Sequence, residues 1–455
     1  MPASTDHLAP MDPLAAIPSA SPLPEACDVL VIGAGPAGSA CAQLLARAGK
    51  AVCLMDAQSF PREKICGDGL IPDAHAAFAR LGVADQIRAY AHPVPHLVCV
   101  GPRGGRIEIP GHLATLARRE LDVILLEAAR RAGAAFHAPW RFEALLHADG
   151  AGRPATGARL KGADGTQQEV RASRVVLATG AVAQGLLAAD LCERRTPSAI
   201  ALRAHVRCPA LVDRIRGLEL IWHEKLRPGY GWIFPMKDGV FNIGVGLFQT
   251  DSEGIAGPSQ DSWSPSGGGP GTARTWGRPR SAPNLRQVFN AFLEAYEPAR
   301  LLMQDGEVLG DIKREAGGWA LKGAPLRCSL DGAKWSAPGV LVTGEAAGAT
   351  YHFTGEGIGK AMETGMLAAE ALLVSEDEGV QRAAYEARLR ALQPRFALYE
   401  KANLINSHPW LADLLIWRGR HSAFLRGRMA KILDETSNPG SLVTVRGLAR
   451  AMIGV

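Results

Sequence analysis

The chain has 455 residues, enough for two or three structural units at the usual ~150 residues per domain. Hydrophobic residues make up 47% and charged residues 21%, a composition that excludes disordered, collagenous and membrane-embedded proteins. The net charge of +5 is too small over this length for the dense basic surface that nucleic acid requires, so we expect no nucleic-acid partner.

The chain begins with a segment that lacks folding signals. Residues 1–25 are rich in Pro, Ala and Ser and show no hydrophobic periodicity, so we predict a disordered leader. The first folded elements follow at once: an apolar strand from Asp28 to Ile32, a helix from Pro36 to Ala48 and a second strand from Ala51 to Met55. This order predicts a βαβ unit with parallel strands that are buried on both faces.

A glycine-rich turn joins the first strand to the helix. Its sequence is Gly33-Ala-Gly-Pro-Ala-Gly38. Gly33 permits the tight turn, Gly35 lets the backbone approach a pyrophosphate, and Gly38 allows close packing of helix and strand. Asp56 ends the second strand, where a carboxylate accepts hydrogen bonds from an adenosine ribose. The segment therefore predicts a dinucleotide site.

Later elements alternate between two kinds. Further nucleotide-type elements are a helix at 116–132, buried strands at 175–178 and 339–343, and a helix at 355–373. Between them, segments 98–109 and 200–248 carry strand patterns with hairpin glycines. The pattern predicts an α/β fold in which a β-rich domain is inserted into a nucleotide-binding domain.

Two further segments differ in composition from their surroundings. In residues 249–283, 18 of 35 residues are Gly, Pro or Ser, which predicts a flexible surface insertion; its Trp263 and Trp276 leave a lid or docking segment as the alternative. After about Gln381 the pattern is helical, and the tail is basic with interspersed tryptophans. That tail is a candidate for peripheral membrane contact, or it covers the nucleotide-binding domain with its apolar face.

Cysteine usage indicates where the protein works. The eight cysteines are scattered, with no Cys-x-x-Cys pair and no His/Cys cluster at metal spacing. This pattern is typical of reduced thiols, so we expect a cytoplasmic protein without a disulfide framework or a bound metal.

Four motifs in order along the chain are distinctive. They are Phe60-Pro-Arg-Glu-Lys-Ile-Cys-Gly-Asp-Gly-Leu70, Tyr230-Gly-Trp-Ile-Phe-Pro235 running into Gly244-Val-Gly246, Gly344-Glu-Ala-Ala-Gly348, and Thr354-Gly-Glu-Gly-Ile358. Together they resemble those of the geranylgeranyl reductase-like FAD-dependent oxidoreductases. That family belongs to the superfamily of group A flavoprotein monooxygenases and flavin-dependent halogenases.

The resemblance implies FAD as the cofactor and NAD(P)H as its reductant. Glu345 stands where the family usually has Asp, and Gly355-Glu-Gly357 opens a helix whose N–H groups would stabilise negative charge on the flavin. Arg118 matches the family's FAD-contacting arginine, although Arg119 lies beside it. The residues expected to bind FAD are Gly33, Gly35, Pro36, Ala37, Gly38, Asp56, Arg62, Arg118, Gly344, Glu345, Gly355, Glu356, Gly357 and Ile358.

Candidate catalytic residues also follow from the resemblance. Cys66 lies in a motif that borders the substrate cavity in reductase relatives, and His352 stands where the family usually has Pro. Either side chain is a candidate proton donor, and each is otherwise a residue that fills space. The expected substrate-binding residues are Tyr230, Trp232, Phe234, Pro235 and Phe353, with an ordinary core role as the alternative.

The implied activity is oxidoreduction of a bulky apolar or aromatic substrate. The leading hypothesis is hydride transfer from the flavin to a C=C bond of an isoprenoid-like or other alkene. The alternative is an O2-dependent monooxygenase that hydroxylates an aromatic or indole group, either free or tethered to a peptide or carrier. A flavin-binding assembly factor without catalysis is a third hypothesis.

The predicted organisation interleaves two domains. The FAD-binding, Rossmann-like domain comprises 26–95, 116–182 and 311–375; substrate-domain strands occupy 96–115, the β-rich substrate domain 183–310, and the helical C-terminal region 376–455.

Overall fold

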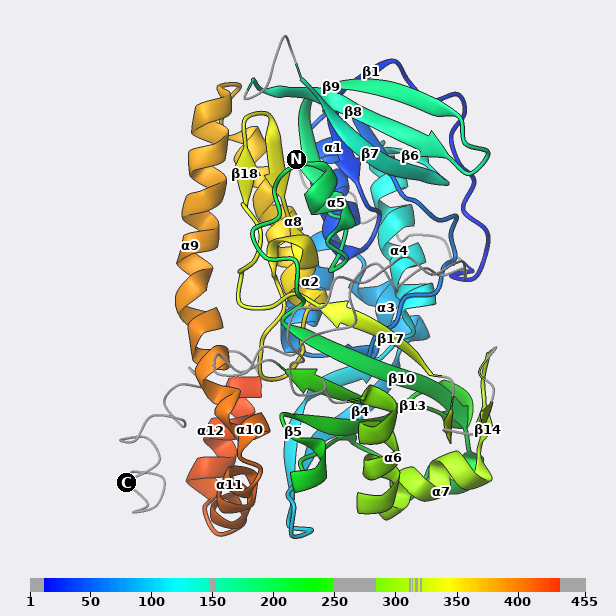
Figure 1. Cartoon of the computed structure of the whole chain (residues 1–455), viewed down its shortest axis with the longest axis vertical. Helices are drawn as coiled ribbons and strands as arrows, with labels where there is room; N and C mark the ends of the chain where they lie inside the picture. Colours follow the sequence, from blue (N-terminus) through cyan, green and yellow to red (C-terminus); the bar gives the residue numbers. More distant parts are fainter. Residues whose placement is uncertain are drawn as a thin grey trace, which may run out of the picture.

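The computed structural model describes residues 12–147, 153–248, 284–310, 312, 314–315, 318–319 and 321–433. The predicted insertion at 249–283, the first eleven residues and the end of the tail at 434–455 lie outside these residues. The mixed α/β architecture predicted from the sequence is confirmed, and Figure 1 shows two sheets stacked along the long axis of the molecule.

The first sheet contains the predicted βαβ unit. In the described residues it has eight strands, with the order β18-β19-β9-β1-β2-β6 and a β7–β8 hairpin attached to β9. Strands β19, β9, β1, β2 and β6 run parallel, and Val31 of β1 pairs with Leu54 and Val176 on its two sides. The strands are β1 (Ala26–Ile32), β2 (Val52–Met55), β6 (Ala135–His137), β7 (Trp140–His147), β8 (Ala155–Gly162), β9 (Gln167–Leu177), β18 (Ser336–Ala337) and β19 (Val340–Val342).

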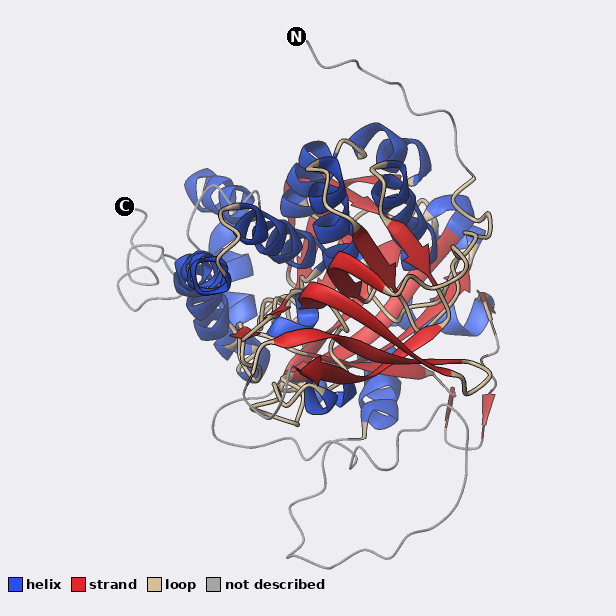
Figure 2. Cartoon of the chain, turned by 90° about the horizontal axis from the view of Figure 1, so that it is seen from above, coloured by secondary structure: helices blue, strands red, loops and turns tan. Residues whose placement is uncertain are grey.

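Helices cover one face of this sheet. Helix α1 (Pro36–Arg47) packs against α4 (Arg118–Arg131) and α8 (Ile358–Leu373), and α9 (Glu378–Ala402) lies along α8. Figure 2 shows most of the helices gathered on one side of the strands. A Cβ atom on Gly365 would lie 2.1 Å from the Ala37 carbonyl oxygen, so α1 and α8 approach as closely as backbones can. Apolar burial on both faces explains the continuous hydrophobic runs of β1 and β2.

The second sheet is mainly antiparallel. Its nine described strands have the order β14-β10-β13-β12-β11-β4-β5-β3, with β17 also pairing with β10. Helix α6 (Leu285–Ala295) covers one of its faces, followed by α7 (Glu297–Asp305). The strands are β3 (Gly69–Leu70), β4 (His92–Val100), β5 (Arg106–Thr115), β10 (Ala199–Arg207), β11 (Leu218–Ile221), β12 (Gly229–Pro235), β13 (Val240–Phe248), β14 (Glu307–Val308) and β17 (Lys322–Leu326).

Smaller elements complete the described chain. The C-terminal helices α11 (Trp410–Arg420) and α12 (Ala423–Leu433) pack on β4 and β5, so the tail covers the second sheet and not, as the alternative had it, the nucleotide-binding domain. No described helix combines the length and the apolar character that crossing a membrane would require. The remaining elements are α2 (Pro72–Leu81), α3 (Ala84–Tyr90), α5 (Gln184–Ala188), α10 (Leu404–Ser407) and a two-stranded ribbon of β15 (Arg314–Glu315) and β16 (Gly318–Trp319).

Several predicted boundaries differ from the structure. Strand β3 and the first residues of β4 fall in the segment 26–95 that was assigned to the FAD-binding domain, but both strands belong to the second sheet. Residues 12–25 were expected to be disordered, yet Ile17 N–H donates to the Phe60 carbonyl and Ala20 N–H to that of Phe136, because the segment runs along the edge of the first sheet. The third part of the FAD-binding domain was expected from residue 311, but β17 belongs to the second sheet through its pairing with β10. That part therefore begins after β17.

Candidate active site

The glycine-rich turn is closed by backbone contacts. Gly33 has φ +105°, and a Cβ there would lie 2.3 Å from the Ala178 carbonyl oxygen. A Cβ on Gly38 would lie 1.8 Å from the carbonyl oxygen of Gly33. Neither position accepts a side chain, and the first turn of α1, with Pro36 and Ala37, is held against the strand ends. The N–H groups at the start of α1 therefore face the space that an anion would fill.

Charged side chains surround this turn. Asp56 Oδ2 accepts the N–H of Ala34 at 2.9 Å, which places the carboxylate at the end of β2 beside the turn. Arg62 lies between Asp56 and Asp122, at 3.6 and 3.2 Å. Arg118 forms a two-pronged pair with Asp122, at 2.6 and 2.8 Å. Two largely shielded arginines are thus oriented by carboxylates at the start of the nucleotide site.

The two guanidinium groups converge on Gly35. A Cβ on Gly35 would lie 3.5 Å from Nη2 of Arg62 and 3.8 Å from Nη2 of Arg118. A Cβ there would fill the space between the guanidinium groups and the backbone with ordinary van der Waals contacts, whereas glycine leaves that space open for a ligand. Guanidinium groups facing helix N–H groups form the donor set that a pyrophosphate requires. Arg119 is not part of the cluster, so Arg118 is the arginine placed beside the turn.

The C-terminal glycine motifs meet the same helix from the other side. Gly344 has φ +66°, and a Cβ there would lie 2.6 Å from the Ala37 Cβ. The 3-10 helix Gly344–Ala347 carries Glu345 in its first turn. Gly357 caps α8, and a Cβ there would lie 2.6 Å from Thr350 Oγ1. The segment Gly355–Ile358, including Glu356, therefore ends at the α8 N-terminus close to α1, and this cradle of glycines fits FAD.

Aromatic residues form a wall on the second sheet. Tyr230, Trp232 and Phe234 alternate along β12 and share one face, as the sequence predicted. The Trp232 ring lies across Gly244 of β13, because a Cβ there would be 2.2 Å from Trp232 Cζ2. Tyr230 stacks on Phe248 with ring centroids 5.5 Å apart. We call Tyr230, Trp232, Phe234 and Phe248 the aromatic wall.

The wall contacts both flavin-side segments. The Phe234 ring lies 3.3 Å from a Cβ placed on Gly67 or on Gly69, so it covers the turn that follows Cys66. The Tyr230 hydroxyl donates to the carbonyl of Thr354, directly before Gly355. Burial raises the pKa of Tyr230, so this hydroxyl keeps its proton. Pro235 ends β12, and its carbonyl accepts the Thr115 hydroxyl at 2.6 Å.

A second anchor reaches the site from the C-terminal region. Asn406 of α10 is fully buried; its Oδ1 accepts from Trp222 Nε1 at 2.8 Å and its Nδ2 donates to the Phe353 carbonyl at 3.0 Å. The rings of Trp222 and Phe353 stack, with centroids 6.1 Å apart. The segment that leads into α8 is therefore fixed by both the wall and α10.

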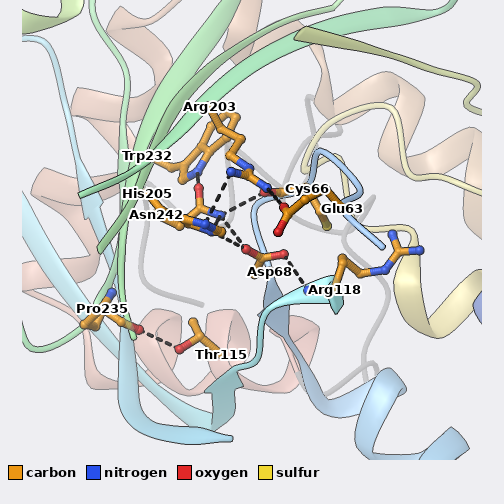
Figure 3. A network of polar contacts seen from close by, with 10 residues as sticks. All are labelled: Glu63, Cys66, Asp68, Thr115, Arg118, Arg203, His205, Trp232, Pro235 and Asn242. Carbon is orange, nitrogen blue, oxygen red and sulfur yellow. Dashed lines mark hydrogen bonds and ion pairs between the residues drawn. The ribbon is translucent and has the colours of Figure 1, made fainter. Parts of the chain in front are cut away.

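A buried polar network ties the Cys66 turn to the second sheet (Figure 3). Asp68 is 1% exposed; its Oδ2 accepts from His205 Nε2 at 2.7 Å and from Asn242 Nδ2 at 2.8 Å. Its Oδ1 accepts the N–H of Arg118 at 3.2 Å. Asn242 also donates to the Cys66 carbonyl and accepts from Trp232 Nε1, at 2.8 and 2.9 Å. One carboxylate thus connects the start of α4, the Cys66 turn and the aromatic wall.

The two candidate proton donors lie on opposite sides of this arrangement. Burial raises the pKa of the Cys66 thiol, although neighbouring Arg118 lowers it in part. His352 is 8% exposed, and its ring centroid lies 6.0 Å from that of Phe248. Both are placed at the edges of the wall, Cys66 on the β3 side and His352 on the α8 side.

Sequence reasoning missed Asp68, Arg203, His205, Asn242 and Asn406. Asp68 stood inside a motif already singled out, and its position between two glycines was a usable signal. His205 and Asn242 are direct cross-strand partners on β10 and β13. No local pattern marks such a pair, because strand register depends on tertiary pairing.

Comparison with known proteins identifies relatives of this chain. A family model for an FAD binding domain matches residues 26–194. The menaquinone reductase of Mycobacterium tuberculosis is 32% identical over 384 residues, 78% of each chain. Digeranylgeranylglycerophospholipid reductase 2 of Methanopyrus kandleri is 28% identical over 359 residues, 77% of this chain and 78% of that one.

Solved structures share the fold. A geranylgeranyl bacteriochlorophyll reductase-like protein from Thermoplasma acidophilum matches with TM-score 0.63 and 20% identity, over 94% of this chain and 96% of that one. A flavoprotein/dehydrogenase from Cytophaga hutchinsonii matches with TM-score 0.70 and 16% identity, over 94% and 98%. The chain belongs to the geranylgeranyl reductase-like flavoproteins of the group A family. It is an FAD-dependent oxidoreductase.

Proposed function

We propose that this enzyme reduces a carbon–carbon double bond in a bulky apolar, isoprenoid-like substrate. The observation that carries the proposal is the aromatic wall, which lies between the Cys66 turn and the segment leading into α8. Stacked aromatic rings suit a long unsaturated chain and keep water away from it. The related menaquinone and digeranylgeranylglycerophospholipid reductases bear names that denote prenylated compounds, which supports the same substrate class.

The residues have separate tasks in this proposal. Arg62, Arg118 and the start of α1 hold the pyrophosphate of FAD, while Glu345 and the α8 N-terminus face the rest of the cofactor. Bound FAD supplies the hydride, and NAD(P)H is the proposed source of its electrons. Cys66 donates the proton to the second carbon, a role that its raised pKa supports because the thiol stays protonated at neutral pH. His352 is the alternative donor.

An anaerobic experiment tests the reaction. The holoprotein is reduced with dithionite and mixed with menaquinone-type prenylated quinone without O2. We expect oxidation of the flavin and, after any quinol has been reoxidised to the quinone in air, a quinone product that is still heavier by two hydrogens, because a reduced side-chain double bond is not reoxidised. Cys66→Ser should slow this reaction by roughly 100-fold, within the usual range for loss of a general acid, whereas Cys27→Ser, a half-buried thiol on β1, serves as the control. Flavin that stays reduced with every prenylated compound would refute the proposal.

A monooxygenase is the second candidate, because the same wall offers stacking partners to an aromatic ring, either free or carried by a peptide or carrier protein. The anaerobic experiment separates the two reactions. A monooxygenase oxidises its flavin only when O2 is admitted, and its product gains an oxygen atom. The reductase needs no O2 and its product gains hydrogen.

We also propose that α11 and α12 touch an anionic membrane surface from the cytoplasmic side. Trp410, Trp417 and Phe424 are 54, 58 and 63% exposed, and the same two helices carry Arg418, Arg420, Arg426, Arg428 and Lys431. Exposed aromatic and basic side chains on the same two helices match the apolar and anionic parts of a lipid interface. The scattered thiols, free in this fold, support the cytoplasmic location.

Vesicle sedimentation tests the membrane contact. The protein should bind phosphatidylglycerol vesicles more strongly than phosphatidylcholine vesicles, and the double variant Trp417→Ser/Phe424→Ser should reduce the bound fraction at least several-fold. Val212→Ser, another exposed apolar residue outside these helices, is the control. Equal binding of the double variant would contradict the contact.

A further inference from the structure

Arg203 occupies the same face of the second sheet as the aromatic wall. Strand pairing places it directly beside Gly244, which in turn lies beside Trp232. Because Gly244 has no side chain, the indole of Trp232 extends over it toward Arg203. The next position on the same face is also small, since Ala201 pairs with Gly246. A permanent cation therefore borders an apolar, ring-lined surface.

The Arg203 side chain is largely shielded from solvent and lacks a strong partner. It is 12% exposed, and its Nη2 reaches Glu63 at 3.3 Å, but that carboxylate is 66% exposed. An ion pair with so exposed a carboxylate contributes little to the stability of the fold. The buried Nε atom has no hydrogen-bond partner among the residues that the structure describes. A desolvated guanidinium with an unused donor is costly unless something binds it.

The orientation of Arg203 is built into the polar network. Its Nη1 approaches His205 Nδ1 at 3.3 Å, and because a guanidinium only donates, Nδ1 accepts. The other ring nitrogen of His205 then carries the proton that is donated to Asp68. Asp68 thus fixes the His205 ring, and His205 fixes Arg203. This chain of contacts keeps the guanidinium beside the wall when no ligand is present.

We propose that Arg203 binds the polar oxygen of an amphiphilic substrate and so determines which prenylated compounds are accepted. The shared chemistry is an oxygen acceptor, either a quinone carbonyl or a phosphate, next to an apolar chain that lies on the aromatic wall. A planar guanidinium suits both oxygens, because it donates in a fixed fork. The inference rests on the proposed function, in which the chain of the substrate lies on that wall.

Binding without turnover tests this role. Oxidised holoprotein, with no electron donor, is titrated in mixed micelles with phylloquinone, phytyl phosphate and phytene, which share one chain and differ in their polar end. Binding is followed through the flavin absorbance. We expect Arg203→Met to weaken binding of the preferred headgroup by roughly 10- to 100-fold, as for loss of a charge-assisted hydrogen bond, while phytene binding is unchanged. The headgroup affinity of Arg203→Lys should lie between those of the wild type and Arg203→Met.

Lys322→Met is the matched control. Lys322 is exposed on β17 and pairs with Arg203 across the strands, so its removal deletes the same charge one strand away. It should leave all three affinities as they are. Unfolding midpoint and FAD dissociation constant are measured for every variant, and they should match the wild type.

The outcomes separate this inference from the proposed function. If the wild type binds all three compounds equally, or if Arg203→Met weakens phytene as much as the others, the headgroup role is wrong although the apolar site stands. A changed FAD dissociation constant in Arg203→Met would assign the guanidinium to the cofactor and overturn the proposal. If no phytyl compound binds, the proposed function fails and this inference fails with it.

Discussion

Gly38→Ala is expected to yield a protein that does not hold FAD. The added methyl would lie 1.8 Å from the Gly33 carbonyl oxygen and 3.3 Å from the Ala178 side chain. Backbone at both ends of the turn must then move, which separates α1 from β1 and spoils the N–H groups that face the pyrophosphate. We expect FAD affinity to fall by at least ~100-fold, about 3 kcal/mol, in line with severe overpacking.

The measurement is the flavin absorbance of the purified variant together with an FAD titration. Gly427→Ala is the matched control, since a Cβ there meets nothing within 4 Å. It should purify with bound flavin like the wild type. A yellow Gly38→Ala protein with ordinary affinity would show that the turn is not the pyrophosphate site.

Asp68→Ala has the second largest expected effect. It removes the acceptor of His205, Asn242 and the Arg118 N–H at once and leaves these donors buried. Breaking a buried charged network by deleting one member costs about 3–5 kcal/mol, so the urea midpoint should fall markedly. Asp68→Asn should cost less, because it keeps one oxygen and tolerates the left-handed backbone.

A backbone contribution must be separated from that of the hydrogen bonds. Asp68 has φ +61°. Alanine adopts this conformation with a penalty of about 1 kcal/mol, whereas glycine adopts it without a penalty. Asp68→Gly should therefore be slightly more stable than Asp68→Ala while still losing the network. Asp213→Ala, at an exposed carboxylate, is the control. If Asp68→Ala and Asp213→Ala have the same urea unfolding midpoint, the network does not contribute to the stability of the fold.

Sequence patterns predicted those parts of the site whose geometry is determined by residues close together in the chain. Gly33 and Gly38 could be assigned from the sequence, because the positive φ of Gly33 and the close approach of Gly38 to the Gly33 carbonyl belong to the strand–turn–helix geometry itself. The alternation of Tyr230, Trp232 and Phe234 likewise revealed a shared face, since period two is a property of any strand.

Other parts depend on which segments meet. The Arg203, His205 and Asn242 cluster arises from the register of β10 and β13, and its link to Asp68 spans more than a hundred residues. The leader was predicted to be disordered because residues 12–25 lack periodicity, yet their order comes from edge hydrogen bonds to Phe60 and Phe136. The composition of a segment does not reveal hydrogen bonds to residues that are distant in the sequence.

The interleaving of the two sheets also constrains how the chain folds. Strands β4 and β5 lie between β2 and β6 in sequence, but β4 completes its ladder only with β11, through pairs such as Leu97 with Leu218. In the first sheet, β9 pairs on one side with β19, which is much later in the sequence; Val175 of β9 pairs with Val340 of β19. This is a high-contact-order topology, which implies slow folding. During synthesis, the nucleotide-binding region leaves the ribosome before its partner strands exist, so it must remain incomplete, and open to aggregation, until most of the chain has been made.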